Sequence, residues 1–96
     1  MSQIVADAVK ALTEKLSGDA FDGSAKFEIE GEGSLVIDAD GVRASDEDTD
    51  VTLSADVDTF QSILEGDLNP TAAFMSGKLT VDGDMGAAMR LGSVLA

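Results

Sequence analysis

The side chains available for chemistry in this 96-residue sequence are almost all carboxylates, hydroxyls and a few cations. Histidine, cysteine, tryptophan and tyrosine are absent. The chain therefore lacks the commonest general base, a thiolate nucleophile and every metal site built on imidazole or thiolate. With 19 acidic residues, two carboxylates will often lie close by chance, so such a pair is weak support for catalysis. We expect a protein that is not an enzyme and needs no cofactor.

Two acidic segments have the composition of cation sites but not their spacing. Asp38-Ala39-Asp40-Gly41 begins like a calcium loop, but its sixth and twelfth positions are Arg43 and Thr49, where such a loop needs Gly and Glu. We interpret it as a hairpin turn, for which Asp-Gly is a favoured dipeptide. The acidic run from Asp46 to Asp50 is interpreted as a solvated connection, with a loosely bound divalent cation as the alternative.

The balance of charge excludes several classes of partner. The formal net charge is −13, and a field of this sign repels nucleic-acid phosphates and anionic lipid surfaces. No apolar run is long enough to span a bilayer, so we expect neither nucleic-acid binding nor stable membrane insertion. The first residues lack the basic region of a signal peptide and cysteine is absent, which favours a cytoplasmic location. The oligomeric state stays open.

Hydrophobic spacing predicts four helices, over residues 3–17, 57–65, 70–76 and 85–95. Their candidate N-caps are Ser2, Asp56, Asn69 and Asp84, and the first three helices end at Gly18, Gly66 and Gly77. The first helix has an apolar face of Val5, Ala8, Val9, Leu12 and Leu16. The last helix places Met85, Ala88, Met89, Gly92 and Leu95 on one side.

Alternating and short apolar segments predict five strands: around Phe27 and Ile29, over Leu35–Ile37, Val42–Ala44 and Val51–Ser54, and around Leu79 and Val81. Turns at Gly31-Glu32-Gly33 and Asp38–Gly41 join the first three into a meander. The predicted fold is therefore a single α+β domain over residues 1–96, in the order α-βββ-β-α-α-β-α. Its five-stranded, mainly antiparallel, twisted sheet is covered by helices.

Three of the four methionines, Met75, Met85 and Met89, lie in the last two predicted helices. Methionine is flexible and adapts to irregular apolar shapes. Two interpretations follow. These side chains fill an ordinary core, which is the simpler interpretation from residue physics alone, or they form an adaptable wall around an apolar ligand.

Residues 69–86 closely resemble the signature of the sterol carrier protein type 2 (SCP-2) family. That signature reads Asn-Pro-x-x-Ala-Phe-Met-x-Gly-Lys-Leu, then an alternating strand, then Gly-Asp-Met. The residues that match it are Asn69, Pro70, Ala73, Phe74, Met75, Gly77, Lys78, Leu79, Gly83, Asp84 and Met85. The resemblance extends from about residue 4 onward, and the chain looks like the compact, stand-alone bacterial form.

This resemblance implies a hydrophobic tunnel between a five-stranded sheet and its helices. Members of the family bind sterols, fatty acids, fatty acyl thioesters or phospholipids without a cofactor, and some move them between membranes. Similar domains also occur fused to enzymes. The acidic character of this chain favours an uncharged or weakly anionic ligand. A dry, rigid tunnel of ~400 Å³ would cost about 10 kcal/mol, so we expect the ligand-free cavity to be collapsed, partly wet or occupied by a scavenged lipid.

The main functional hypothesis is non-catalytic binding, with intracellular transfer as an extension, of a fatty acid, phospholipid or other apolar small molecule. The alternative is an acidic protein-interaction module with the same fold and no ligand cavity. Under the main hypothesis, the residues expected to line or gate the pocket are Val57, Phe60, Ile63, Leu64, Phe74, Met75, Leu79, Met85 and Met89.

Overall fold

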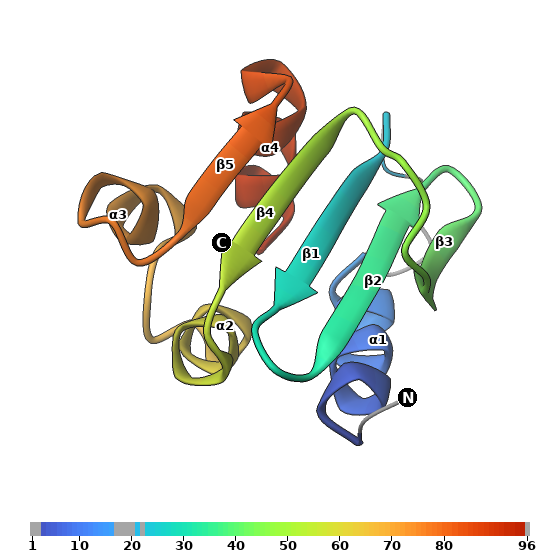
Figure 1. The fold of residues 1–96 in the computed structure, drawn as a ribbon, viewed down its shortest axis with the longest axis horizontal. Coiled ribbons are helices and arrows are strands. Elements are labelled where there is room, and N and C mark those ends of the chain that lie inside the picture. Colours follow the sequence, from blue (N-terminus) through green and yellow to red (C-terminus); the bar gives the residue numbers. More distant parts are fainter. Residues whose placement is uncertain (1–2, 17–20, 22, 96) are drawn as a thin grey trace.

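The computed structural model describes residues 3–16, 21 and 23–95. Its elements are α1 (Gln3–Leu16), β1 (Ala25–Ile29), β2 (Gly33–Asp38), β3 (Gly41–Ala44), β4 (Val51–Ala55), α2 (Val57–Glu65), α3 (Pro70–Met75), β5 (Thr80–Gly83) and α4 (Met85–Leu95). This order confirms the predicted one (Figure 1). The predicted caps Ser2 and Gly18 lie outside the described residues. No helix within the described ranges has the length and apolar character needed to cross a membrane.

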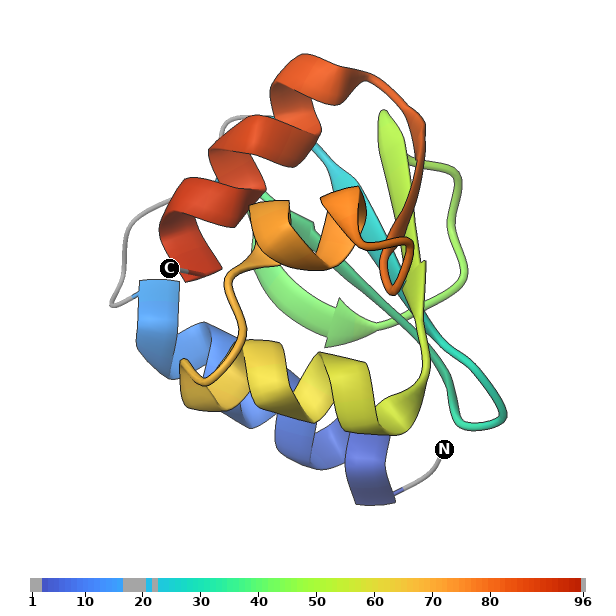
Figure 2. The same ribbon diagram turned by 90° about the vertical axis from the view of Figure 1, so that its left-hand side faces the viewer.

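The strands of the described chain form one sheet in the order β3-β2-β1-β4-β5. Neighbouring strands are antiparallel except β1 and β4, which run parallel, so the sheet is mixed rather than purely antiparallel. The described helices lie on one face of this sheet and leave the other face uncovered by helices (Figure 2). The fifth strand begins at Thr80, one residue after the predicted Leu79.

The core lies between the sheet and the helices because the strands alternate as predicted. In β1 the residues Ala25, Phe27 and Ile29 are buried, and the paired positions of β4 are buried in the same register. From the helix side, α1 buries four residues of its predicted face: Val5, Ala8, Leu12 and Leu16. The rings of Phe27 and Phe60 meet with their centroids 4.7 Å apart and their planes inclined at 56°. This tilted arrangement is favourable for aromatic pairs and fixes α2 against the sheet.

Helix α2 begins and ends at the residues that the sequence predicts. The Asp56 carboxylate accepts a hydrogen bond from the backbone N–H of Thr59 at 2.7 Å. This bond lowers the pKa of Asp56 below its ordinary value. At the other end Gly66 adopts a left-handed conformation with φ of 83°, as a helix-terminating glycine does.

The acidic connection between β3 and β4 passes along the face of the sheet that the helices leave open (Figure 1). It is held there by polar contacts, among them Lys26 Nζ to Asp46 Oδ1 at 3.1 Å and the Ser34 hydroxyl donating to the Ser45 carbonyl at 2.8 Å. Asp38 pairs with Gly41 across the predicted hairpin turn, which is confirmed. In the part of the chain that the structure describes, no group of acidic residues has the arrangement of a metal site.

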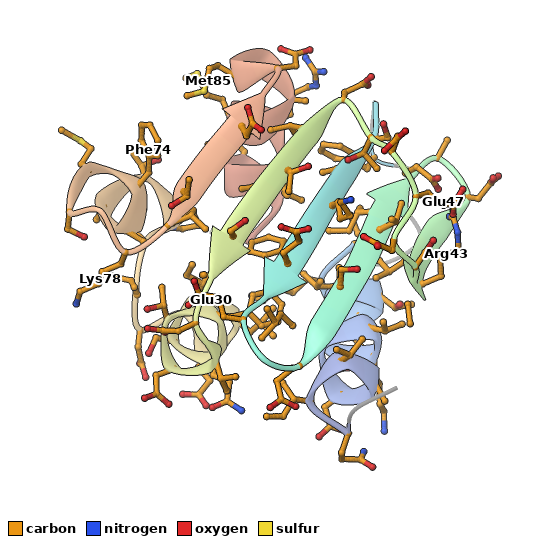
Figure 3. All side chains as sticks on the ribbon, viewed as in Figure 1. Glu30, Arg43, Glu47, Phe74, Lys78 and Met85 are labelled. Atoms are coloured by element: carbon orange, nitrogen blue, oxygen red, sulfur yellow. The ribbon has the colours of Figure 1, made fainter. Side chains whose placement is uncertain are left out.

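Arg43 joins this acidic segment to the edge of the sheet. Its guanidinium lies 3.0 Å from the carboxylate of Asp38 and 2.7 Å from that of Glu47. Figure 3 shows the side chains of Arg43 and Glu47 side by side. The hydrogen bonds from Arg43 lower the pKa of both carboxyl groups. Because these pKa values are lower in the folded state, the resulting stability is present above the ordinary carboxyl pKa and is lost as the pH falls through the lowered one.

We therefore predict that Arg43→Gln destabilises the protein at neutral pH and that the difference from the wild type shrinks as the pH falls through the lowered pKa of each carboxyl group. Thermal unfolding at a series of pH values measures this. The control is Lys10→Gln, which removes the same charge from an exposed position of α1. A difference that persists at low pH would show that Arg43 acts through packing instead.

Strand β5 depends on a close approach between two backbones. Gly83 pairs with Val51, and a Cβ at Gly83 would lie 2.5 Å from the carbonyl oxygen of Asp50. The following residue, Asp84, donates its N–H to the same carbonyl at 2.9 Å. Gly83 also has φ of +115°, which side chains rarely allow. Glycine is thus required where β5 leads into α4.

Gly83→Ala should destabilise the fold more than Gly41→Ala, which is the matched control. Gly41 has a similar φ of +117°, but a Cβ there meets nothing within 4 Å. Conformational strain costs about 1–3 kcal/mol at either position, and the clash at Gly83 adds about 1–3 kcal/mol. Chemical denaturation of both variants compares the two costs. Equal destabilisation would mean that the backbones of β4 and β5 can move apart at little cost in free energy.

Candidate ligand-binding cavity

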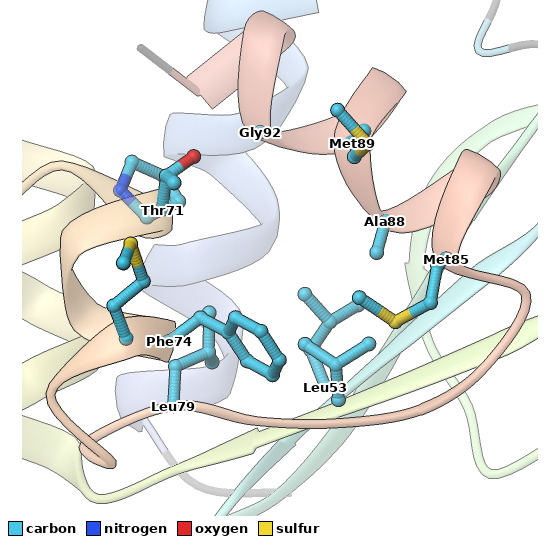
Figure 4. Close-up of a pocket in the computed structure, with 11 residues that line it drawn as sticks. Leu53, Thr71, Phe74, Leu79, Met85, Ala88, Met89 and Gly92 are labelled. Carbon is cyan, nitrogen blue, oxygen red and sulfur yellow. The ribbon is translucent and has the colours of Figure 1, made fainter.

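A cavity of about 270 Å³ opens between α3 and α4 and reaches the helix-facing side of β4 and β5 (Figure 4). Its walls and floor are almost entirely apolar, and Thr71 supplies the polar side chain among the lining residues. These residues are Leu53, Pro70, Thr71, Phe74, Met75, Leu79, Val81, Met85, Ala88, Met89 and Gly92.

Helix α3 forms one wall and is short, so its caps determine its position. The Asn69 side chain accepts from the backbone N–H of Thr71 at 2.8 Å, and Pro70 occupies the first turn. Ala73 faces the core, whereas the Phe74 ring points across the cavity towards Met85 (Figure 4). The predicted Asn-Pro helix start is therefore confirmed, and it orients Phe74.

Helix α4 forms the opposite wall and has two apolar faces. The Asp84 carboxylate accepts from the N–H of Gly86 at 2.8 Å, which confirms the predicted cap. One face buries Ala87 and Leu91 in the core. The other face, with Met85, Ala88, Met89 and Gly92, lines the cavity. These four positions belong to the stripe that the sequence places on one side of this helix.

The floor comes from the strands and from the segment between α3 and β5. Strand β4 contributes the inward-facing side chain of Leu53. After α3 the chain turns at Gly77, whose φ is +81°, and the N–H groups of Lys78 and Leu79 both bond to the Ala73 carbonyl, at 2.9 and 3.1 Å. This arrangement returns the chain to the sheet and buries Leu79 beneath the cavity.

Large apolar side chains stand exposed around this cavity. The exposed fractions are 81% for Met75, 73% for Met89, 46% for Met85 and 41% for Phe74. Phe74 and Met85 both lie on the outer side of β5, away from β4 (Figure 3). The interpretation of these methionines as core residues is wrong, because core residues would be shielded from solvent. An exposed apolar cluster around a cavity is typical of a surface that binds an apolar partner.

Five of the nine predicted site residues line the cavity: Phe74, Met75, Leu79, Met85 and Met89. The four from α2 lie elsewhere. Phe60 and Ile63 are fully buried in the core, and Val57 and Leu64 pack against it. Phe60 and Leu64 also border a second, smaller cavity of about 230 Å³ between α1 and α2. Contact of the nine residues with a ligand stays a prediction.

Sequence reasoning missed six lining residues as members of the site: Leu53, Pro70, Thr71, Val81, Ala88 and Gly92. Ala88 and Gly92 could have been predicted as lining residues, since they lie on the same helical stripe as Met85 and Met89. Leu53 carried no such signal, because an inward strand residue has the same pattern whether it faces a helix or a cavity.

No titratable side chain is among the lining residues, so the cavity contains no acid, base or charged group for chemistry. What it can do is remove a hydrocarbon group from water, with a polar end left at the open mouth. Shape and apolar area, rather than specific polar contacts, therefore govern what it binds.

Ala88→Phe should fill the cavity and weaken uptake of a neutral apolar dye such as Nile red by about tenfold or more, a loss of about 1.4 kcal/mol. The matched control is Ala72→Phe, because Ala72 is exposed on α3 and does not line the cavity. Dye fluorescence titrations compare the two variants. Equal effects would place the dye outside the cavity.

Comparison with known proteins agrees with the resemblance at residues 69–86. Residues 4–96 match the model of the SCP-2 sterol transfer family. Hydroxysteroid dehydrogenase-like protein 2 of Danio rerio is 51% identical over 47 residues, which cover 49% of this chain and 11% of that protein. The chain spans about a tenth to a quarter of the length of the relatives that carry this name.

Solved structures share the fold. The sterol carrier protein domain 2 of Helicoverpa armigera has 28% sequence identity and a TM-score of 0.77, covering 96% of this chain and 85% of that one. Sterol Carrier Protein-2 of Aedes aegypti, in complex with the C16 fatty acid palmitate, has 22% identity and a TM-score of 0.77, covering 100% and 97%.

Proposed function

Since this chain belongs to the SCP-2 sterol transfer family, we propose that the cavity between α3 and α4 binds the hydrocarbon part of one lipid molecule, and that a fatty acid is the first candidate. The observation that carries the proposal is the ring of exposed Phe74, Met75, Met85 and Met89 around an apolar cavity. The palmitate bound to the Aedes aegypti protein supports the choice of ligand. The role is non-catalytic, whether the chain acts alone or within a longer protein.

The cavity volume sets the length of chain that it accepts. At roughly 30 Å³ each, about nine water molecules fill 270 Å³, and a methylene group is of similar size. Burial of nine methylenes contributes about 7 kcal/mol, which corresponds to a Kd between about 1 mM and about 1 µM. A longer chain protrudes from the mouth or separates α3 from α4. We propose that the predicted tunnel forms by this separation.

The head group stays at the mouth of the cavity. Thr71 is the polar side chain among the lining residues, and no cation is among them to pair with a carboxylate. The net charge of −13 adds a general repulsion of anions. Uncharged or weakly anionic amphiphiles therefore suit this site better than strongly anionic ones, and transfer to an acceptor is the proposed extension of binding.

The affinity for straight-chain primary alcohols should rise about fourfold per methylene up to about nine carbons, and more slowly beyond. Isothermal titration calorimetry of the purified protein with a chain-length series measures this. Analysis of lipid extracted from the protein as isolated complements it. If no chain length binds below millimolar concentration, and no lipid is extracted, the proposed function is wrong.

The alternative, an acidic interaction module, was expected to have no ligand cavity. The open cavity between α3 and α4 weighs against it. In the part of the chain described, three acidic groups near this surface, those of Asp38, Asp46 and Glu47, are paired with Lys26 or Arg43, which reduces what these groups offer to a basic partner. Lipid binding is therefore the function that the geometry supports best.

A further inference from the structure

The oxidisable side chains of this protein are concentrated at the cavity. The sequence has four methionines and no cysteine, tryptophan, tyrosine or histidine. Three of the four methionines line one cavity, and the fourth is Met1. Their thioethers are the groups that a two-electron oxidant attacks first when cysteine is absent. Exposure of Met75, Met85 and Met89 makes each of them reachable from solvent.

We propose that Met75, Met85 and Met89 form an oxidisable wall, and that hydrogen peroxide weakens ligand binding by converting one of them, Met85, to methionine sulfoxide. This inference rests on the proposed lipid-binding function. In each reaction the sulfur attacks one peroxide oxygen, an S–O bond forms and the O–O bond breaks. The leaving hydroxide takes the proton of the transferred hydroxyl, which yields water. The sulfur loses two electrons and the peroxide gains them.

Met85 is the residue whose oxidation has the largest effect on binding. Its side chain extends over Leu53 and faces Phe74 across the cavity (Figure 4). A sulfoxide oxygen there needs a hydrogen-bond donor once a hydrocarbon chain has displaced water. The lining offers one polar side chain, that of Thr71, and Thr71 lies on α3, across the cavity from Met85 rather than beside it (Figure 4). The oxidised cavity therefore retains water in place of ligand.

Met75 and Met89 are the more exposed pair and lie at the rim, where a sulfoxide stays hydrated with ligand bound. Exposure orders the reaction rates, so Met75 and Met89 oxidise before Met85. Bound ligand covers the half-exposed Met85 more than it covers the rim. It therefore slows oxidation of Met85 selectively.

The test is a hydrogen peroxide time course on the full chain, with two readouts from each sample. Peptide mass spectrometry reports the sulfoxide at each methionine, and displacement of a fluorescent fatty acid reports affinity. We expect affinity to fall about tenfold or more, in step with oxidation of Met85 rather than of Met75. Prior saturation with dodecanol should protect Met85, and a methionine sulfoxide reductase should restore binding.

Each variant serves as its own reference, through the ratio of its affinities before and after peroxide. Met85→Leu should show a ratio near one, whereas the double variant Met75→Leu/Met89→Leu should keep most of the loss. Met85→Gln, a polar side chain of similar length, should bind weakly before any peroxide is added. Thermal unfolding confirms that each variant is folded.

Several outcomes would overturn the inference. One is full oxidation of Met85 with unchanged affinity, and another is a loss that persists in Met85→Leu. Resistance of all three methionines under conditions that oxidise free methionine would do the same. If the untreated wild type fails to bind the probe, the proposed lipid-binding function fails with it. That failure is visible before peroxide is added and so is distinct from the others.

Discussion

The contact between Gly83 and the backbone of Asp50 determines the position of both cavity walls. Strand β5 is an edge strand joined to the sheet through β4, and it connects α3 to α4. Because Gly83 has no side chain, the two backbones approach closely enough for Asp84 to bond to the Asp50 carbonyl and also to cap α4. A shift of β5 would therefore move both helices and change the cavity that they enclose.

The cavity resolves a conflict between binding and stability. A dry interior void large enough for a lipid would consume most of the stability of a chain this small, at roughly 24 cal/mol per Å³. The cavity here is smaller, about 270 Å³, and is open to solvent at its mouth. Its large side chains Phe74, Met75, Met85 and Met89 are exposed instead of lining a closed void. The cost is thus exposed apolar surface rather than contacts missing in the interior, and a ligand that covers this surface would recover it.

Local signals predicted the elements well, because caps and turns depend on neighbouring residues. Asp56, Asn69 and Asp84 cap their helices, and Asp40-Gly41 forms the hairpin, as their types indicate. The site was predicted in part, because an apolar stripe shows that a helix face is covered but not what covers it. The stripe on α2 packs into the core through Phe60, whereas the stripe on α4 with Met85 faces a cavity. The parallel pairing of β1 with β4 joins distant residues, and no local pattern reveals it.

Methionine suits the exposed wall for the same reason that makes it vulnerable. Under the proposed function the wall packs against itself when the cavity is empty and spreads around a hydrocarbon chain when a ligand enters, and an unbranched thioether does both at little strain. Leucine would provide similar apolar area with fewer rotamers, but without the polarisable sulfur that adapts to irregular contacts. That same sulfur is open to oxidants, and the absence of cysteine leaves no more reactive thiol in the chain to be oxidised first. The proposed adaptability of the cavity and its proposed sensitivity to oxidation are thus two consequences of the same side chain.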